Sequence, residues 1–143
     1  MSLIDLLQHK PAILAGVAAL YGCVAGSFLN VVFHRWPIMR QRAKHGGFAE
    51  PYNLAVPRSA CPSCGYVLSF WENVPVVSYL VLRGRCRACS VQISPRYLMV
   101  EVAMGLSSGV VAYGFGFSWT MLAALLALWV TPAVVRMLHT DRG

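Results

Sequence analysis

Four of the five cysteines are spaced as two metal-binding knuckles. Cys61 and Cys64 are separated by two residues, and Cys86 and Cys89 repeat this spacing after 21 intervening residues. Two CxxC pairs at about this separation are typical of a structural zinc site, in which four thiolates surround one tetrahedral ion. Two disulfides or a redox-active CxxC are the alternatives. The remaining cysteine, Cys23, lies in an apolar stretch and is interpreted as a small packing residue.

The acidic residues are few and widely spaced. General acid–base hydrolysis needs a pair of carboxylates close together, and the spacing of the five acids recommends no such pair. Asp141, beside Arg142, is interpreted as a solvated tail residue. We therefore predict no catalytic residue in this chain. The only candidate for such a role is Asp141. Glu101 is expected in the first turns of a helix, where it favours the helix dipole. A functional role is the alternative, because acids near a membrane are often functional.

The composition indicates a membrane protein. The residues AVILMFWYC make up 57% of the 143 residues, charged residues make up 12%, and the mean hydropathy is +0.59. Soluble domains carry about 25% charged residues, so a water-soluble globule of this composition could not cover its surface. A disordered chain, a disulfide-rich secreted domain and a simple nucleic-acid-binding domain are poorly supported. We predict an α-helical integral membrane protein with about three transmembrane helices and a zinc-binding cytoplasmic loop between the first and second.

Two uncharged stretches supply the membrane spans. Residues 12–33 would form a helix about 33 Å long, enough for the ~30 Å hydrocarbon core. Pro11 suits the start of this helix, and Pro37 is expected to stop it. Residues 102–135 are uncharged but too long for one span, and the cluster at 113–118 is typical of a turn. We therefore predict two further helices, near residues 96–113 and 118–138.

The basic residues predict the orientation. Nine of the twelve lie between Arg35 and Arg96, together with only two acids. The positive-inside rule places this loop in the cytoplasm, with the N-terminus outside and the C-terminus inside. Disulfides do not persist in a reducing cytoplasm, which favours zinc. The charge excess is explained by topology, and no nucleic-acid partner is expected.

The predicted organisation has three parts: residues 1–33 for the N-terminus and first span, 34–96 for the basic loop with its zinc module, and 97–143 for a helical hairpin with a short tail. Within the loop, residues 74–82 form a nine-residue apolar run, too short to cross the bilayer. We predict that this run is a strand of the zinc module, with Pro75 at its edge or start. Contact with the membrane surface, suggested by Trp71, is the alternative.

A series of short motifs runs along the chain. They are GSFLN at 26–30 continuing into VVFHRWP at 31–37, CPSC at 61–64, WENVP at 71–75, SYL at 78–80, RGRC at 83–86 followed by Cys89, ISPRY at 93–97, and VE at 100–101. In this order and combination the chain resembles the type IV prepilin leader peptidases, over about residues 15 to 118. The combination is highly specific, whereas a CxxC pair alone would not be.

The resemblance implies an aspartic peptidase of the bacterial inner membrane. Such enzymes cut the positively charged leader from type IV prepilins and type II secretion pseudopilins, and many then N-methylate the new N-terminus. The implied partners are these substrates and the lipid bilayer, and the implied methyl donor is S-adenosylmethionine. Two aspartates near the cytoplasmic membrane face activate water. One ends the helix that corresponds to about residues 119–138, and the other lies in a GxGD motif further on.

The sequence departs from this pattern after its last apolar stretch. It reads VRMLHTDRG at 135–143, where Asp141 is the only acid, and it contains no GxGD motif. We therefore expect a truncated or degenerate member of the family that does not cleave prepilins by itself. The alternative is a non-catalytic membrane zinc module that acts as a partner in pilus or secretion assembly.

Overall fold

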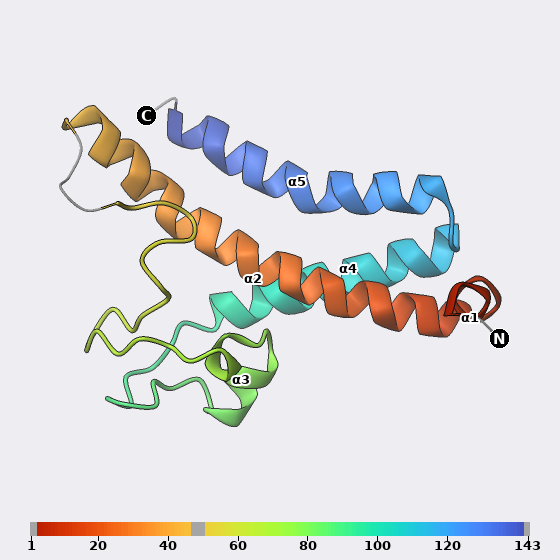
Figure 1. Ribbon diagram of the computed structural model, residues 1–143, viewed down its shortest axis with the longest axis horizontal. Coiled ribbons are helices and arrows are strands. Elements are labelled where there is room, and N and C mark those ends of the chain that lie inside the picture. The colour runs from red at the N-terminus through yellow and green to blue at the C-terminus, as the bar shows by residue number, and fades with distance from the viewer. Residues whose placement is uncertain (1–2, 47–50, 142–143) are drawn as a thin grey trace.

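A computed structural model describes residues 3–46 and 51–141, and the main elements in these residues are helices. They are α1 (Leu3–His9), α2 (Pro11–Lys44), α4 (Arg96–Phe115) and α5 (Trp119–Asp141). The loop between α2 and α4 adds the 3-10 helix η1 (Trp71–Asn73) and the short α3 (Val77–Val81). Figure 1 shows the three long helices running side by side, with the loop folded against one end of the bundle. As predicted, three helices (α2, α4 and α5) are long and apolar enough to cross a membrane.

Small residues let α2 and α4 touch along their backbones. A Cβ atom added to Gly22 would lie 2.5 Å from a carbonyl oxygen of α4, and one added to Gly26 would lie 2.8 Å from the Cα atom of Glu101. Gly105 and Gly109 of α4 approach α2 in the same way. Both pairs have the GxxxG spacing, which permits close helix contact in lipid, where no hydrophobic effect drives helices together. Neither pair was among the features predicted from the sequence.

The third long helix, α5, packs less tightly. Only 11% of its most apolar stretch is buried, against 28% for α2 and for α4. Its Trp129 side chain donates a hydrogen bond of 2.9 Å to the hydroxyl of Ser108, which itself donates to the carbonyl of Met104. A small apolar core joins the three helices near the α4–α5 turn and consists of Leu14, Ala18, Ala112, Met121 and Leu125.

The predicted turn between the last two helices is confirmed. The helix α4 ends at Phe115, and Gly116 follows with a positive φ of 61°, which glycine adopts without steric cost. Ser118 precedes α5, and its hydroxyl accepts a hydrogen bond from the backbone N–H of Met121. This bond satisfies one of the free N–H groups at the start of the helix.

The predicted end of the first helix is wrong. Pro37 does not stop α2, which continues to Lys44. A proline removes one backbone hydrogen bond, but the residues after it (IMRQRAK) are mostly good helix formers. The extension is also held from outside, because the guanidinium of Arg42 lies 4.1 Å from the ring centroid of Tyr52.

The predicted strand in the loop is also wrong. The apolar run contains the one-turn helix α3 instead, preceded by η1. In the described residues the loop offers only two isolated bridges, at the cysteine knuckles, and no strand with which the run could pair. A helical turn satisfies backbone groups within the segment itself, as in the bond from the N–H of Ser78 to the carbonyl of Val74.

Candidate metal centre

The four knuckle cysteines converge on one point. Their Sγ atoms all lie within 4.8 Å of one another, and none of them forms a disulfide. The Sγ atoms of Cys61 and Cys89 are 3.8 Å apart, and those of Cys64 and Cys86 are 3.9 Å apart. A tetrahedral zinc ion with bonds of ~2.3 Å holds its sulfur ligands about 3.8 Å from one another. The cluster therefore has the ligand type, number and spacing to hold one such ion.

The two knuckles have the same backbone hydrogen bonds. The N–H of Cys61 donates to Tyr66, and the N–H of Gly65 donates back to Cys61, each at 2.9 Å. Residues Cys86, Val91 and Ser90, each 25 positions later, repeat both bonds at the same distance. Gly65 has a φ of +73°, and Ser90 adopts +58° at the corresponding position. The loop thus contains a structural repeat that turns each cysteine pair toward the other.

Backbone N–H groups of the first knuckle favour the thiolate forms of its cysteines, which are the forms that bind a cation. The N–H groups of Cys64 and Ser63 lower the pKa of the Cys61 thiol to about 7. At Cys64 the N–H of Tyr66 also favours the thiolate, but desolvation and the neighbouring cysteine sulfurs outweigh it and raise the pKa to about 12. Once one cysteine is deprotonated, its negative charge therefore disfavours deprotonation of the next, because like charges repel at this distance. A cation bound between the sulfurs offsets this repulsion and favours the thiolates.

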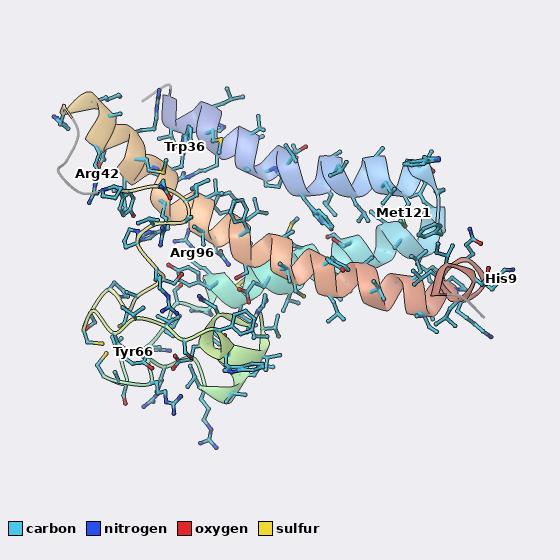
Figure 2. The ribbon with its side chains drawn as sticks, viewed as in Figure 1. His9, Trp36, Arg42, Tyr66, Arg96 and Met121 are labelled. Atoms are coloured by element: carbon cyan, nitrogen blue, oxygen red, sulfur yellow. The ribbon has the colours of Figure 1, made fainter. Side chains whose placement is uncertain are left out.

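Glu72 of η1 connects the two knuckles. Its Oε2 atom accepts hydrogen bonds from the N–H of Ser69 at 2.8 Å and from the hydroxyl of Tyr66 at 3.2 Å, and its Oε1 lies 3.9 Å from Nη1 of Arg87. Ser69 is the main cause of a lowered pKa at this buried carboxyl. Tyr66 lies within the loop module (Figure 2) and follows the first knuckle, whereas Arg87 lies inside the second. The carboxylate therefore holds the module together beside the cysteines.

The loop between α2 and α4 is fixed to the long apolar helices at α4. Glu101, in the second turn of α4, accepts a hydrogen bond of 2.7 Å from the N–H of Val76, just before α3. Close by, the Asn30 side chain of α2 donates to the carbonyl of Tyr97 at 3.0 Å. The cysteine cluster is thus held at the end of the bundle where α4 begins.

Arg35 fixes the other side of the loop to α2. The side chain is buried, and its guanidinium donates to the carbonyl oxygens of Asn53 and Pro57. Arginine keeps its charge when buried and offers five donors, so it can hold two loop carbonyls at once. The segment leading into the first knuckle is therefore tied to a rigid helix.

A cavity of about 680 Å³ lies between the module and the helices. Its walls include Ser27, Asn30 and His34 from α2, Tyr97 and Glu101 from α4, and Cys61, Glu72, Tyr79 and Cys86 from the loop. This volume is typical of small-molecule sites. The cavity is lined by both apolar and ionisable groups and adjoins the cysteine cluster.

The residues predicted as metal ligands are brought together, and of the five acids Glu72 and Glu101 line the same cavity. Asp141 is the last residue of α5, and its side chain lies outside what the structure describes, as does Glu50. Sequence reasoning missed the burial of Arg35 and Glu72 and the bond made by Glu101. The signal available in the sequence was a single charged residue within each of three motifs. These residues are Arg35 after His34, Glu72 in WENVP and Glu101 in VE.

Comparison with protein-family models identifies the chain. Residues 20–115 match the model described as the bacterial peptidase A24 N-terminal domain. The chain belongs to the peptidase A24 family. A relative in Stutzerimonas stutzeri, named prepilin leader peptidase/N-methyltransferase, is 46% identical over 90% of this chain. Relatives of the same name in Pseudomonas aeruginosa and Burkholderia pseudomallei are 45% and 51% identical over 90% and 87% of the chain.

The match covers only part of each A24 relative. The chain covers 48% of the S. stutzeri and P. aeruginosa proteins and 43% of the B. pseudomallei protein, so it spans about half the length of these curated relatives. The matched region contains all four knuckle cysteines and the residues that hold the module to α2 and α4. No solved structure matches the chain significantly.

Proposed function

We propose that this chain forms the membrane-anchored zinc module of a prepilin-processing system. In this system the leader is cleaved from type IV prepilins or type II secretion pseudopilins, and the new N-terminus is methylated, with S-adenosylmethionine as methyl donor. The proposal is carried by one observation: a four-cysteine cluster with zinc spacing is fixed by Glu101 to helices that could span a membrane. The names of the A24 relatives supply the substrate class.

The proposed zinc has a structural role. Four cysteine ligands fill a tetrahedral zinc site and leave no position for water. Such an ion contributes folding energy to a loop with few apolar contacts. The residues that would hold it are Cys61, Cys64, Cys86 and Cys89.

Peptide hydrolysis is not assigned to this chain alone. An aspartic peptidase needs two carboxylates that share a water and a proton. In the described residues, Glu72 is bound within the loop module and Glu101 is bound to Val76, so each is held by its own partners. The sequence contains no GxGD motif. We expect the cleaving carboxylates to come from the part of the relatives that this chain does not cover.

Co-expression tests this function. We expect no leader loss from a prepilin when this chain is expressed alone in cells lacking a prepilin peptidase. Co-expression with the uncovered C-terminal half of the P. aeruginosa relative should restore cleavage, measured as a size shift of the pilin. That half alone is the control. Cleavage by this chain alone, abolished in Asp141→Asn, would contradict the proposal and make Asp141 catalytic.

A non-catalytic partner role is the second candidate, favoured by the four-cysteine cluster, which has the ligand set of a structural metal site. It would gain support if the two halves failed to restore cleavage while the intact P. aeruginosa relative cleaved the same prepilin in the same cells. Co-purification of this chain with pilus or secretion components would then identify its partner.

We also propose that the chain lies in the bacterial inner membrane with its basic loop in the cytoplasm. A reporter that is active only in the cytoplasm should work when fused after Gly46, near the end of α2. A reporter that is active only outside should work when fused after Gly116, in the α4–α5 turn. The reverse pattern would overturn the orientation, and the positive-inside argument with it.

A further inference from the structure

The short helix α3 has its apolar side chains on the outside of the loop module. Val77, Leu80 and Val81 are spaced as one face of a helix, and each is more than half exposed. The polar side chain of Tyr79 is turned toward the module instead, because its hydroxyl donates to the carbonyl of Ile93. A helix on a water-soluble surface has the reverse arrangement, with apolar residues inside and polar residues outside.

Two aromatic side chains extend this surface. Phe70 and Trp71, at the start of η1, are 73% and 77% exposed and pack edge to face with their ring centroids 5.4 Å apart. Trp71, Val77 and Val81 line one groove, so η1 and α3 share a continuous apolar surface. We call this surface the apolar face; its members are Phe70, Trp71, Val77, Leu80 and Val81. An exposed apolar surface of this kind marks a contact with a protein or a membrane.

The position of α3 beside α4 favours a membrane. The helix α4 has 20 residues, and at ~1.5 Å per residue its length only just matches the ~30 Å hydrocarbon core. If α4 crosses a bilayer, its first turns must therefore lie at the boundary between hydrocarbon and headgroups. Glu101, in the second turn, binds the N–H of Val76 just before α3. The apolar face thus begins beside the first turns of α4 (Figure 1), at the depth where lipid would surround that helix.

Exposed arginines border the apolar face. Arg83 and Arg85 follow α3 directly, and Arg87 lies in the second knuckle. The only acid in residues 51–95 is Glu72, which is buried. An apolar surface next to arginines, without exposed acids, complements anionic lipid headgroups, because these attract basic side chains close to a membrane. Contact with an apolar protein surface would not require this one-sided charge.

We propose that the apolar face lies in the headgroup region of an anionic bilayer, beside the start of α4, with Arg83 and Arg85 at the lipid phosphates. The loop module then has two anchors, because Glu101 holds it to α4 and the apolar face holds it to lipid. The second anchor stops the module from turning about the first. This docking depends on the proposed membrane location of the chain and adds to it a lipid contact made by the loop itself.

Tryptophan fluorescence of the full chain in nanodiscs tests the docking. The discs contain phosphatidylglycerol with plain or brominated acyl chains, and the brominated chains quench tryptophans that they contact. Subtracting the signal of Trp71→Phe from that of the wild-type chain isolates Trp71, and phenylalanine keeps the face apolar. We expect Trp71 to lose most of its fluorescence in the brominated discs. The loss should be smaller in brominated phosphatidylcholine, where the arginines meet no net negative surface.

A charge placed in the apolar face should release it from lipid. In Leu80→Glu, brominated lipid should no longer quench Trp71, and water-soluble acrylamide should quench it instead. The control is Val67→Glu, which adds the same charge at another exposed apolar residue of the loop, at the first knuckle and outside the apolar face. This variant should behave like the wild-type chain. Metal content equal to that of the wild-type chain shows that the module remains folded in both variants.

The other tryptophans separate the docking from the membrane location. Trp129 lies within α5, so brominated lipid should also reduce the signal of Trp71→Phe if the helices cross the bilayer. Quenching in that variant without quenching of Trp71 would reject the docking alone. Quenching of neither would reject the membrane location and the docking with it.

Three further outcomes would overturn the inference: unchanged quenching of Trp71 in Leu80→Glu, equal quenching in the two lipids, or a Trp71 that neither brominated lipid nor acrylamide reaches. The last result would mean that protein covers the apolar face, such as a second copy of the chain. Prepilin processing is judged separately by the co-expression experiment, because the nanodisc measurement contains no prepilin.

Discussion

Cys86→Ser is expected to release the metal and unfold the loop module while leaving the helices in place. Cys86 is one of two buried ligands in the cluster, and a serine hydroxyl does not replace a thiolate on zinc. Metal binding at such sites contributes about 10 kcal/mol of folding free energy at neutral pH, which is more than a small module gains from its own packing. Metal analysis should show less than one zinc per chain, and limited proteolysis should cut the loop between α2 and α4.

The matched control for this variant is Cys23→Ser. Cys23 packs against Gly105 in the helix pair, far along α2 from the knuckles, and its replacement should leave the metal content unchanged. Circular dichroism should show most of the helix signal in both variants, because α2, α4 and α5 do not depend on the metal. A wild-type chain that contained two disulfides and no zinc would contradict both the metal site and the cytoplasmic location of the loop.

Gly22→Ala is expected to destabilise the helix pair, and Gly16→Ala on the same helix to stabilise it. The new Cβ atom at Gly22 would lie 2.5 Å from the carbonyl oxygen of Met104, a backbone atom that can move only if the helices separate. Overpacking of this kind costs about 1–3 kcal/mol. At Gly16 nothing lies within 4 Å, so alanine should add the 0.5–1 kcal/mol or so that it normally gains over glycine in a helix.

Unfolding of the purified variants in mixed detergent micelles measures this difference, with loss of helix signal as the readout. If helix propensity alone decided the outcome, both alanine variants would be more stable than the wild-type chain. Opposite signs of the two changes therefore show that helix contact decides the effect at Gly22. A stabilising effect at Gly22 would show that the α2–α4 contact does not have the described geometry. Gly22→Ala should also weaken the hold on the loop module, because Glu101 belongs to the same interface.

The features that could be predicted from the sequence are those encoded by neighbouring residues. Runs without charge revealed the three long helices, and the CxxC spacing brought the four cysteines together. Predictions from local sequence failed where the structure depends on contacts with residues far away in the chain. Pro37 is accommodated because the residues after it are mostly good helix formers and Arg42 stacks on Tyr52. The expected strand became α3 because the loop provides no strand for it to pair with.

The buried charges could not be predicted for the same reason. The partner of Glu101 is a backbone N–H 25 residues earlier, and Arg35 binds carbonyls 18 and 22 residues later. Each contact depends on how the loop folds back onto the helices. A sequence pattern shows that a charge is present near an apolar stretch, but it does not show which backbone group that charge contacts.

The close α2–α4 contact also bears on the order of synthesis. The ribosome completes α2 and the whole cysteine-containing loop before it begins α4. During that interval the glycine face of α2 cannot yet contact α4, while the loop already contains all four knuckle cysteines. We therefore expect the nascent loop to acquire its metal before the helix pair forms. The last step of assembly would then be the docking of a preformed module as the arriving Glu101 meets Val76.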